Sequence, residues 1–315
     1  MQQRFVGRSG LRVSTIGLGT LGWGRDNDEH DARDQLTAFL DAGGTLLDTA
    51  VSYGDGASEE MIGSLLAGSV PRDDIVLASK AGIGPAGGRD TSRRALLRQL
   101  DTSLSRLGVD HLDLWQVNAW LDRVPVEETL SALDDAVRTG RTAYVGVSNY
   151  SGWQTALAHT WQRSAPGRAP LVSTQVEYSL LNRDIEHEVL PAADALHVGV
   201  LAWSPLGRGV LTGKYRNGTP ADSRGASPHL ERFVGVYLGA RSRRVVEAVA
   251  RAADGLQLSP SEVALAWVRD RPGVSSAIVG ARTAAQLKGS LGAVDVELPE
   301  EIMAALDDVS EDAGD

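Results

Sequence analysis

The chain has 315 residues, 42% of them hydrophobic and 23% charged, which is an ordinary composition for a globular protein. Its net charge of −10 argues against nucleic acid or an anionic membrane surface as a partner, and no apolar run is long enough to cross a membrane. Because the sequence contains no cysteine, disulfides and thiolate metal sites are excluded. We therefore expect a cytoplasmic protein, since residues 1–4 also lack the apolar core of a signal peptide.

Strand-like and helix-like segments alternate regularly along the chain. Residues 4–14 alternate around Arg8, Ser9 and Gly10, which predicts a short hairpin, and a first strand follows at 15–20. The later apolar runs predict strands at 45–49, 75–80, 112–118, 142–148, 171–178, 199–203 and 276–280. Helical periodicity predicts helices at 28–42, 59–67, 92–107, 126–139, 153–163, 185–195, 241–254, 260–269, 283–291 and 299–309.

Eight strand–helix units with short connections predict parallel strands joined by crossover helices. In a chain of this length they favour an α/β fold that closes into a (β/α)8 TIM barrel, preceded by the N-terminal hairpin. No linker rich in proline, glycine and serine divides the sequence, so we expect one domain over residues 1–315. Residues 207–239 predict a long irregular segment, and segments of this length inside a compact domain are usually functional or disordered.

Three successive apolar runs end on polar residues of different chemical kinds: Asp48, Lys80 and Asn118. A carboxylate buried alone at a strand end is costly, so this pattern does not serve stability. In a barrel, catalytic groups lie at the carboxyl ends of the strands. Further strand ends carry Ser148, Asn149, Gln175, Trp203, Ser204 and Gly280. The sequence therefore predicts one site assembled from several strand ends, with Tyr53 just beyond Asp48.

Spaced motifs along the chain carry a family resemblance. They are G-L-G-T at 17–20, L-D-T-A-x-x-Y-G at 47–54, A-S-K at 78–80, D-L-W-Q-V at 113–117, G-V-S-N-Y at 146–150, Q-V-E-Y-S at 175–179, W-S-P-L-G-R-G at 203–209 and V-G-A-R-T-x-x-Q-L at 279–287. Over roughly residues 4–310 the chain resembles the aldo-keto reductase family. The resemblance implies a barrel whose hairpin caps its lower end and which reduces the carbonyl of an aldehyde or ketone with NADPH, NADH being possible, without a metal.

The resemblance also implies catalytic roles. Tyr53 would be the general acid, because negative charge that develops on a carbonyl oxygen needs a proton donor. Lys80 would lower the pKa of Tyr53, and Asp48 would hold Lys80. Asn118 stands where the family usually has histidine, as in the β subunits of voltage-gated potassium channels. Its amide can donate a hydrogen bond to the substrate oxygen, but it cannot titrate.

The cofactor residues follow from the same resemblance. Around the nicotinamide we expect Thr20, Leu21, Asp48, Ser148, Asn149, Gln175 and Trp203, the last stacking on the ring. The pyrophosphate would lie against Ser204, Leu206, Gly207 and Gly209, beneath Lys214 and Arg224. At the adenosine end we expect Gly280, Arg282 and Gln286, with Arg282 on the 2′-phosphate because guanidinium binds phosphate bidentately. Trp23 and Trp120 would shape the substrate pocket or simply pack.

The main prediction is thus an NADPH-dependent reductase of small carbonyl compounds. Asn118 keeps a second possibility open, a nicotinamide-binding sensor or regulatory subunit with little turnover. The six histidines show no paired spacing typical of metal ligands, so no metal site is expected. The oligomeric state and the native substrate are left open by the sequence.

Overall fold

A closed barrel forms the centre of the computed structural model, which describes residues 1–68, 70–84, 87–221 and 223–311. Within these residues eight parallel strands pair in the order β10-β3-β4-β5-β6-β7-β8-β9. Their bounds are β3 (Ile16–Gly19), β4 (Leu46–Asp48), β5 (Val76–Ala81), β6 (Leu112–Val117), β7 (Thr142–Ser148), β8 (Leu171–Glu177), β9 (Gly199–Trp203) and β10 (Val274–Val279). The barrel closes where Ile16 of β3 lies opposite Ala277 of β10. This confirms the predicted (β/α)8 fold.

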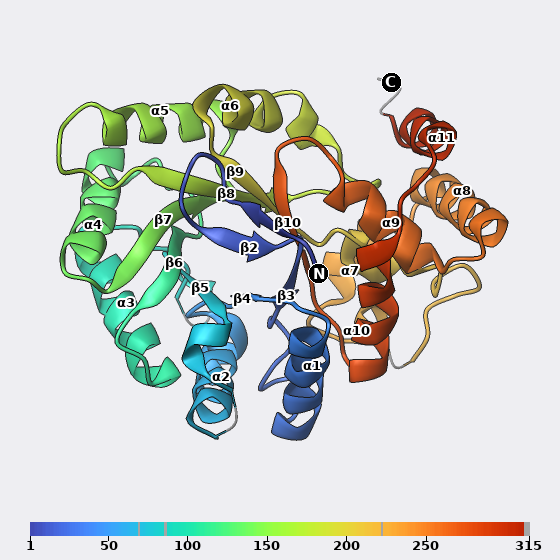
Figure 1. Ribbon diagram of the computed structural model, residues 1–315, viewed down its shortest axis with the longest axis horizontal. Helices are drawn as coiled ribbons and strands as arrows, with labels where there is room; N and C mark the ends of the chain where they lie inside the picture. The colour runs from blue at the N-terminus through green and yellow to red at the C-terminus, as the bar shows by residue number, and fades with distance from the viewer. Residues whose placement is uncertain (69, 85–86, 222, 312–315) are drawn as a thin grey trace.

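Helices surround the barrel on the outside (Figure 1). The longer ones are α1 (Glu29–Asp41), α2 (Ala57–Gly68), α3 (Arg93–Leu107), α4 (Val126–Arg138), α5 (Gly152–Arg163), α6 (Val189–Leu196), α8 (Ala240–Leu256), α9 (Pro260–Arg269), α10 (Ala284–Leu291) and α11 (Glu300–Ser310). Local chemistry sets several starts: Ser151 and Ser259 each begin a helix with a reciprocal capping box. No helix in the described residues combines the length and apolar character needed to cross a membrane.

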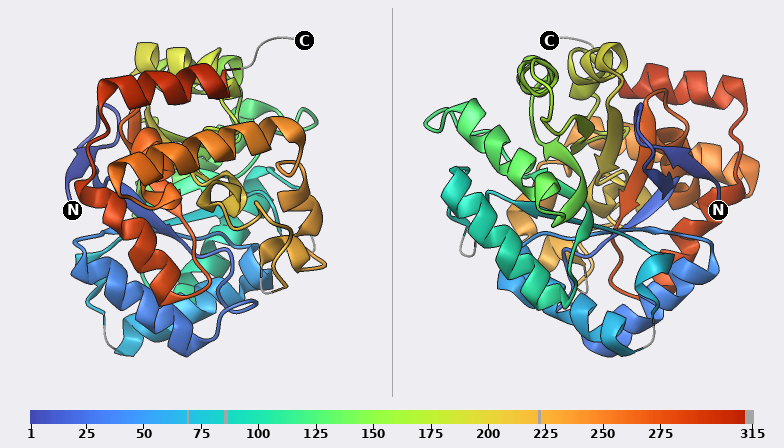
Figure 2. Two further views of the ribbon diagram at one scale, coloured as in Figure 1. Left: turned by 90° about the vertical axis from the view of Figure 1, so that its right-hand side faces the viewer. Right: turned by 60° about the vertical axis from the view of Figure 1, so that its left-hand side comes forward.

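The N-terminal hairpin covers one end of the barrel. Strands β1 (Gln3–Phe5) and β2 (Arg12–Ser14) pair antiparallel, as predicted. Val6, Leu11 and Val13 are buried in one cluster with side chains from the strands: Leu46, Ala78, Leu114, Val172, Leu201 and Ile278. Because the hairpin covers the amino ends of the strands, the opposite end of the barrel is left for a site. In the left view of Figure 2 the hairpin, beside the N label, and segment 207–239 lie on opposite sides of the molecule.

Two predicted segments differ from the structure. The helix expected at 185–195 is wrong in its first part, where a 3-10 turn, η4 (Asp184–Glu186), precedes α6. Pro191 explains the difference, because proline is tolerated in a first helical turn but breaks a helix interior. Segment 207–239, expected to be irregular, contains three short helical pieces: η5 (Gly207–Thr212), η6 (Arg224–Ala226) and α7 (Glu231–Gly235). Asp222 of this segment lies outside the described residues.

Candidate active site

A buried ion pair links the ends of β4 and β5. The Nζ of Lys80 lies 2.6 Å from Oδ2 of Asp48, and both side chains are almost fully buried. The second carboxylate oxygen of Asp48 accepts a hydrogen bond of 2.8 Å from Nε2 of Gln175, at the end of β8. Residues separated by as many as 127 positions in sequence therefore meet at the carboxyl end of the barrel. A carboxylate with both oxygens paired can hold a buried ammonium in a fixed position.

Tyr53 lies next to this pair, at the start of the short helix η1 (Tyr53–Gly56) that follows β4. The Lys80 ammonium is 5.2 Å from the centre of its ring. Burial raises the pKa of Tyr53, and the nearby Asp48 charge adds to this, while Lys80 acts in the opposite direction. Lys80 thus acts on the Tyr53 pKa in the predicted direction, but desolvation outweighs the ammonium, so the pKa is raised overall. Burial acts to lower the pKa of Lys80, but Asp48 and Tyr53 together raise it, so Lys80 stays charged.

Asn118 and Asn149 meet at the same end of the barrel. Asn118 lines the cavity described below, and its backbone oxygen accepts a hydrogen bond of 3.0 Å from Nδ2 of Asn149. Asn149 has a positive φ of 57°, a conformation that asparagine tolerates better than most residues. The two asparagines thus join the ends of β6 and β7.

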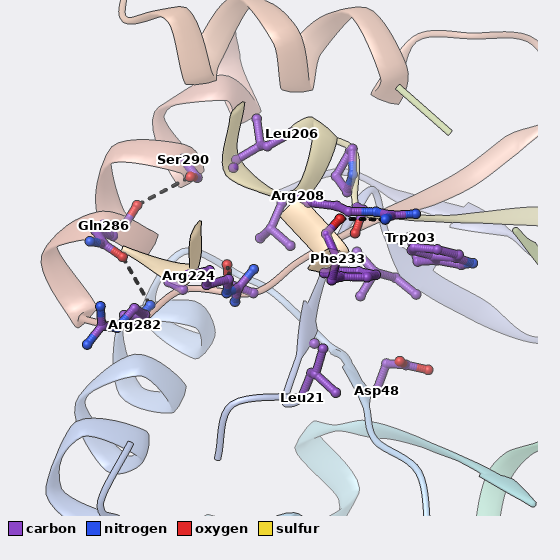
Figure 3. A pocket seen from close by; sticks show the side chains of 18 of the residues that line it. Leu21, Asp48, Trp203, Leu206, Arg208, Arg224, Phe233, Arg282, Gln286 and Ser290 are labelled. Carbon is purple, nitrogen blue, oxygen red and sulfur yellow. Dashed lines mark hydrogen bonds between the residues drawn. The ribbon is translucent and has the colours of Figure 1, made fainter. Parts of the chain in front are cut away.

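A cavity of about 440 Å³ extends from Tyr53 and Asn118 to Arg282 and Gln286. Figure 3 shows Asp48 and Trp203 at one side of this cavity, Arg282, Gln286 and Ser290 of the α10 region at the other, and Arg224 between them. Of the residues predicted for the site, the cavity is lined by Asp48, Tyr53, Lys80, Asn118, Leu21, Ser148, Asn149, Gln175, Trp203, Ser204, Leu206, Gly209, Lys214, Arg224, Gly280, Arg282 and Gln286. The strand ends and the segment 207–239 therefore share one elongated cavity.

The end of the cavity away from Tyr53 is cationic. Lys214, Arg224 and Arg282 line it, although the protein as a whole has a net charge of −10. Burial lowers the pKa of Arg224, and so do the neighbouring guanidinium groups of Arg282 and Arg25, while Asp26 and Tyr215 oppose them. Crowding of like charges is unfavourable unless an anion is nearby. This end of the cavity is therefore suited to phosphate groups.

Two glycines keep the cavity open. A Cβ at Gly209, which has a φ of +93°, would lie 3.3 Å from Nζ of Lys214. A Cβ at Gly280 would lie 3.1 Å from the oxygen of Gly19 and 3.3 Å from Nη2 of Arg224. Because neither residue has a side chain, the backbone at both positions and the cations Lys214 and Arg224 can lie close to a bound ligand. The cavity has an aromatic surface at one end and cations at the other, and the backbone at Gly209 and Gly280 lies close to the space between them. This arrangement fits an elongated dinucleotide.

A sequence model described as "Aldo/keto reductase family" matches residues 15–311. The chain belongs to the aldo/keto reductase family. It is 37% identical to the uncharacterized oxidoreductase YrpG of Bacillus subtilis (strain 168), over 98% of this chain and 96% of that protein. It is 34% identical to an L-glyceraldehyde 3-phosphate reductase of Escherichia coli (strain K12), over 93% and 88% of the two chains. It is also 35% identical to a probable voltage-gated potassium channel subunit beta of Oryza sativa subsp. japonica, over 94% and 92%.

Family membership makes the chain an oxidoreductase of the type that acts on small-molecule carbonyl compounds with a nicotinamide cofactor. Within this aldo/keto reductase, four predicted residues do not line the cavity formed by the described residues. Thr20 is fully buried, and its hydroxyl donates 3.1 Å to the oxygen of Asp48, so it supports the end of β4. Gly207 is buried, and a Cβ there would meet the side chain of Leu181. The structure shows both residues in supporting positions, and their direct contact with a cofactor stays a prediction.

For Trp23 and Trp120 the sequence left pocket lining and simple packing open, and in the structure both pack against neighbouring side chains. Trp23 is only 1% exposed, and its indole donates 3.2 Å to Gln35 of α1, so it belongs to the core. Trp120 packs edge-on against Tyr150 and Trp153, with ring centres 5.2 and 5.4 Å away. Ring packing and a hydrogen bond from each indole nitrogen, to Gln35 and to Asp122, hold the two indoles, and their place after a strand end could not reveal these contacts.

The sequence reasoning missed Arg208 and Phe233, which also line the aldo/keto reductase cavity. Arg208 forms a two-pronged ion pair with Glu177 of β8, with distances of 2.8 and 2.5 Å, and its guanidinium lies 3.9 Å from the centre of the Phe233 ring. The Phe233 ring in turn is nearly parallel to that of Trp203. A signal was available, since Glu177 is a charge at the end of an apolar strand. These contacts attach segment 207–239 to the barrel.

The described residues contain no cluster of three or more histidine, aspartate or glutamate side chains arranged to hold a metal ion. The charges at the strand ends are instead paired with each other, as Lys80 is with Asp48.

Proposed function

We propose that this protein is an NADPH-dependent reductase that converts the carbonyl of an aldehyde or ketone into an alcohol, with Tyr53 as the general acid. The observation that carries the proposal is the position of the Lys80 ammonium, 2.6 Å from Asp48 and 5.2 Å from the centre of the Tyr53 ring. A buried phenol beside a fixed ammonium can release a proton, because the cation stabilises the phenolate that remains.

The chain's own residues account for the acid side of the reaction. Tyr53 donates its proton to the carbonyl oxygen, on which negative charge develops during reduction. The amide of Asn118 would donate a hydrogen bond to the same oxygen, and the position of Asn118 in the lining of the same cavity supports this role. Asp48 and Gln175 keep Lys80 in position. When bound, the nicotinamide cofactor supplies the hydride.

The cavity lining supports NADPH as the cofactor. Trp203, Ser148, Asn149 and Gln175 would hold the nicotinamide; because Nε2 of Gln175 donates to Asp48, its contact would come from Oε1. The pyrophosphate would lie along Ser204, Leu206 and Gly209, with Lys214 and Arg224 above it. Arg282 directly precedes Thr283, the N-cap of α10, so a cationic residue adjoins the backbone N–H groups of a helix start. This pair of features favours a 2′-phosphate, and hence NADPH over NADH.

Asn118 supports a second candidate, a nicotinamide-binding sensor with little turnover. One experiment separates the two: cofactor fluorescence titration together with steady-state NADPH oxidation on a panel of aldehydes, dicarbonyls and ketones. Tight binding with many turnovers supports the reductase. Tight binding without repeated turnover supports the sensor, and an absence of NADPH binding contradicts both.

A further inference from the structure

A second buried ion pair lies behind the loop that carries Tyr53. Glu59 of α2 and Arg106 of α3 approach to 3.4 Å between Oε2 and Nη1, and the Glu59 side chain is completely buried. Neither residue lines the cavity formed by the described residues. The sequence placed Glu59 only at the start of a predicted helix and gave Arg106 no role.

Glu59 holds the outer face of the strand that carries Lys80. Its Oε1 accepts a hydrogen bond of 2.8 Å from the hydroxyl of Ser79. Successive side chains of a strand point to opposite faces, so Ser79 faces the helices while its neighbour Lys80 faces the barrel interior. Glu59 therefore fixes β5 at the residue next to the catalytic ammonium.

Arg106 holds the loop on both sides of Tyr53. Its Nη1 donates 3.1 Å to the backbone oxygen of Val51, and its Nη2 donates 3.4 Å to that of Asp55. The guanidinium also lies against Gly56, whose φ is +107° and where a Cβ would collide with it. Glycine is needed at that position for both reasons. One guanidinium thus fixes the two carbonyl groups that bracket the phenol.

Stability alone does not account for this pair. Burial raises the pKa of Glu59, although Ser103, Ser79 and Arg106 all act to lower it, so the carboxylate is held at a desolvation cost. Replacing a buried ion pair by apolar residues of similar volume is often neutral or stabilising. Apolar residues could not accept the hydrogen bond from Ser79, as Glu59 does, or donate hydrogen bonds to two loop carbonyl groups, as Arg106 does.

We propose that Glu59 and Arg106, here called the Tyr53 clamp, are positioning residues that set the phenol of Tyr53 against the ammonium of Lys80. The inference rests on the proposed function, in which the distance between the Tyr53 phenol and the Lys80 ammonium governs proton donation. Arg106→Met keeps the aliphatic bulk and removes every donor, and Glu59→Gln keeps the shape and removes the charge. We expect both to lower kcat by about 10- to 100-fold, as small misplacements of reacting groups do. NADPH affinity should stay nearly unchanged, and Arg106→Lys should be intermediate.

A matched control removes the ambiguity of lost stability. Arg183 and Glu186 form a similar partly buried ion pair of 2.7 Å, and neither lines the cavity formed by the described residues, so Glu186→Gln should cost stability without lowering kcat. NMR of ring-labelled tyrosine gives a readout that does not need turnover. There are six tyrosines, and Tyr53→Phe assigns the signal of interest. The ring signals of Tyr53 should shift in Arg106→Met and stay in place in Glu186→Gln.

The outcomes are distinguishable. If the wild-type protein reduces no carbonyl, the proposed function fails, and the NMR comparison still tests the clamp. If folded Arg106→Met keeps both the wild-type kcat and the wild-type Tyr53 signals, the clamp has no positioning role. Equal loss of kcat in Arg106→Met and Glu186→Gln would show that the Tyr53 clamp only supports the structure.

Discussion

The indole nitrogen of Trp203 donates a hydrogen bond of 3.0 Å to Oδ1 of Asn149, which ties the end of β9 to the end of β7. Since the amide nitrogen of Asn149 already donates to the backbone of Asn118, this one side chain links three strand ends. The Asn149 side chain would thus orient the indole of Trp203 as well as contact a cofactor.

Asn149→Ala should therefore weaken NADPH binding by about 10-fold, because the lost hydrogen bond to the Trp203 indole and an alanine at a positive φ both carry a cost. Fluorescence titration measures this. Asn182→Ala, in a turn outside the cavity, is the control and should bind like the wild type. An unchanged affinity in Asn149→Ala would mean that the indole is held by packing alone.

Tyr53→Phe should lower turnover by about 10²–10⁴-fold, the usual contribution of a general acid, while NADPH affinity stays nearly intact. Steady-state kinetics and cofactor titration check the two parts separately. Tyr144→Phe, near the hairpin end of the barrel, is a matched control. Comparable loss of turnover and affinity in Tyr53→Phe would show that the tyrosine has been given the wrong role.

The raised pKa of Tyr53 has a direct consequence for the pH dependence of the reaction. Its phenol stays protonated up to at least the ordinary tyrosine value, so kcat for carbonyl reduction should be flat between about pH 6 and 9. The reverse reaction needs the phenolate as base, so its rate should rise with pH over the same range. A reduction rate that falls with an apparent pKa near neutrality would contradict this assignment.

Asn118→His should raise the rate with simple aldehydes, because an imidazole can both donate to the carbonyl oxygen and titrate near neutral pH. The backbone N–H of Asn118, which donates 2.7 Å to the oxygen of Ala81, is unaffected by the change. The measurement is kcat/KM on a short series of aldehydes. An equal or lower rate would indicate that asparagine suits the native substrate.

Arg282→Ala should weaken NADPH binding by about 10-fold or more and leave NADH binding nearly unchanged, since charged hydrogen bonds to the extra phosphate are lost. Arg244→Ala, on the exposed surface of α8, controls for the change in net charge. Equal weakening for both cofactors would place Arg282 against a group that NADPH and NADH share.

The parts of the site that could be predicted are those that follow from strand ends. Asp48, Lys80 and Asn118 each end an apolar run, and in a parallel barrel all such ends meet at one rim. Glu59 and Arg106 could not be found this way, because they are 47 positions apart on two helices and meet only after α2 and α3 pack. The role of Trp23 was left open between pocket and packing for a related reason, since the direction of a loop indole depends on the helix that packs beside it.

The balance of charge and burial also lay beyond the sequence. The sequence indicates that Lys80 and Tyr53 are close, yet the direction of the Tyr53 pKa depends on how completely the surrounding side chains exclude water. Similarly, the break before α6 was signalled by Pro191, but the sequence periodicity alone suggested a continuous helix.

The pairing of β3 with β10 has a consequence for how the protein is made. Ile16 and Ala277 become neighbours only after a ribosome has translated almost the whole chain. Until then one edge of β3 is unpaired, and Val6, Leu11 and Val13 lack the contact with Ile278 that completes their apolar cluster. Exposed edges and apolar surface on incomplete chains invite aggregation. Nascent chains stalled before residue 274 should therefore depend on chaperones far more than the finished protein does.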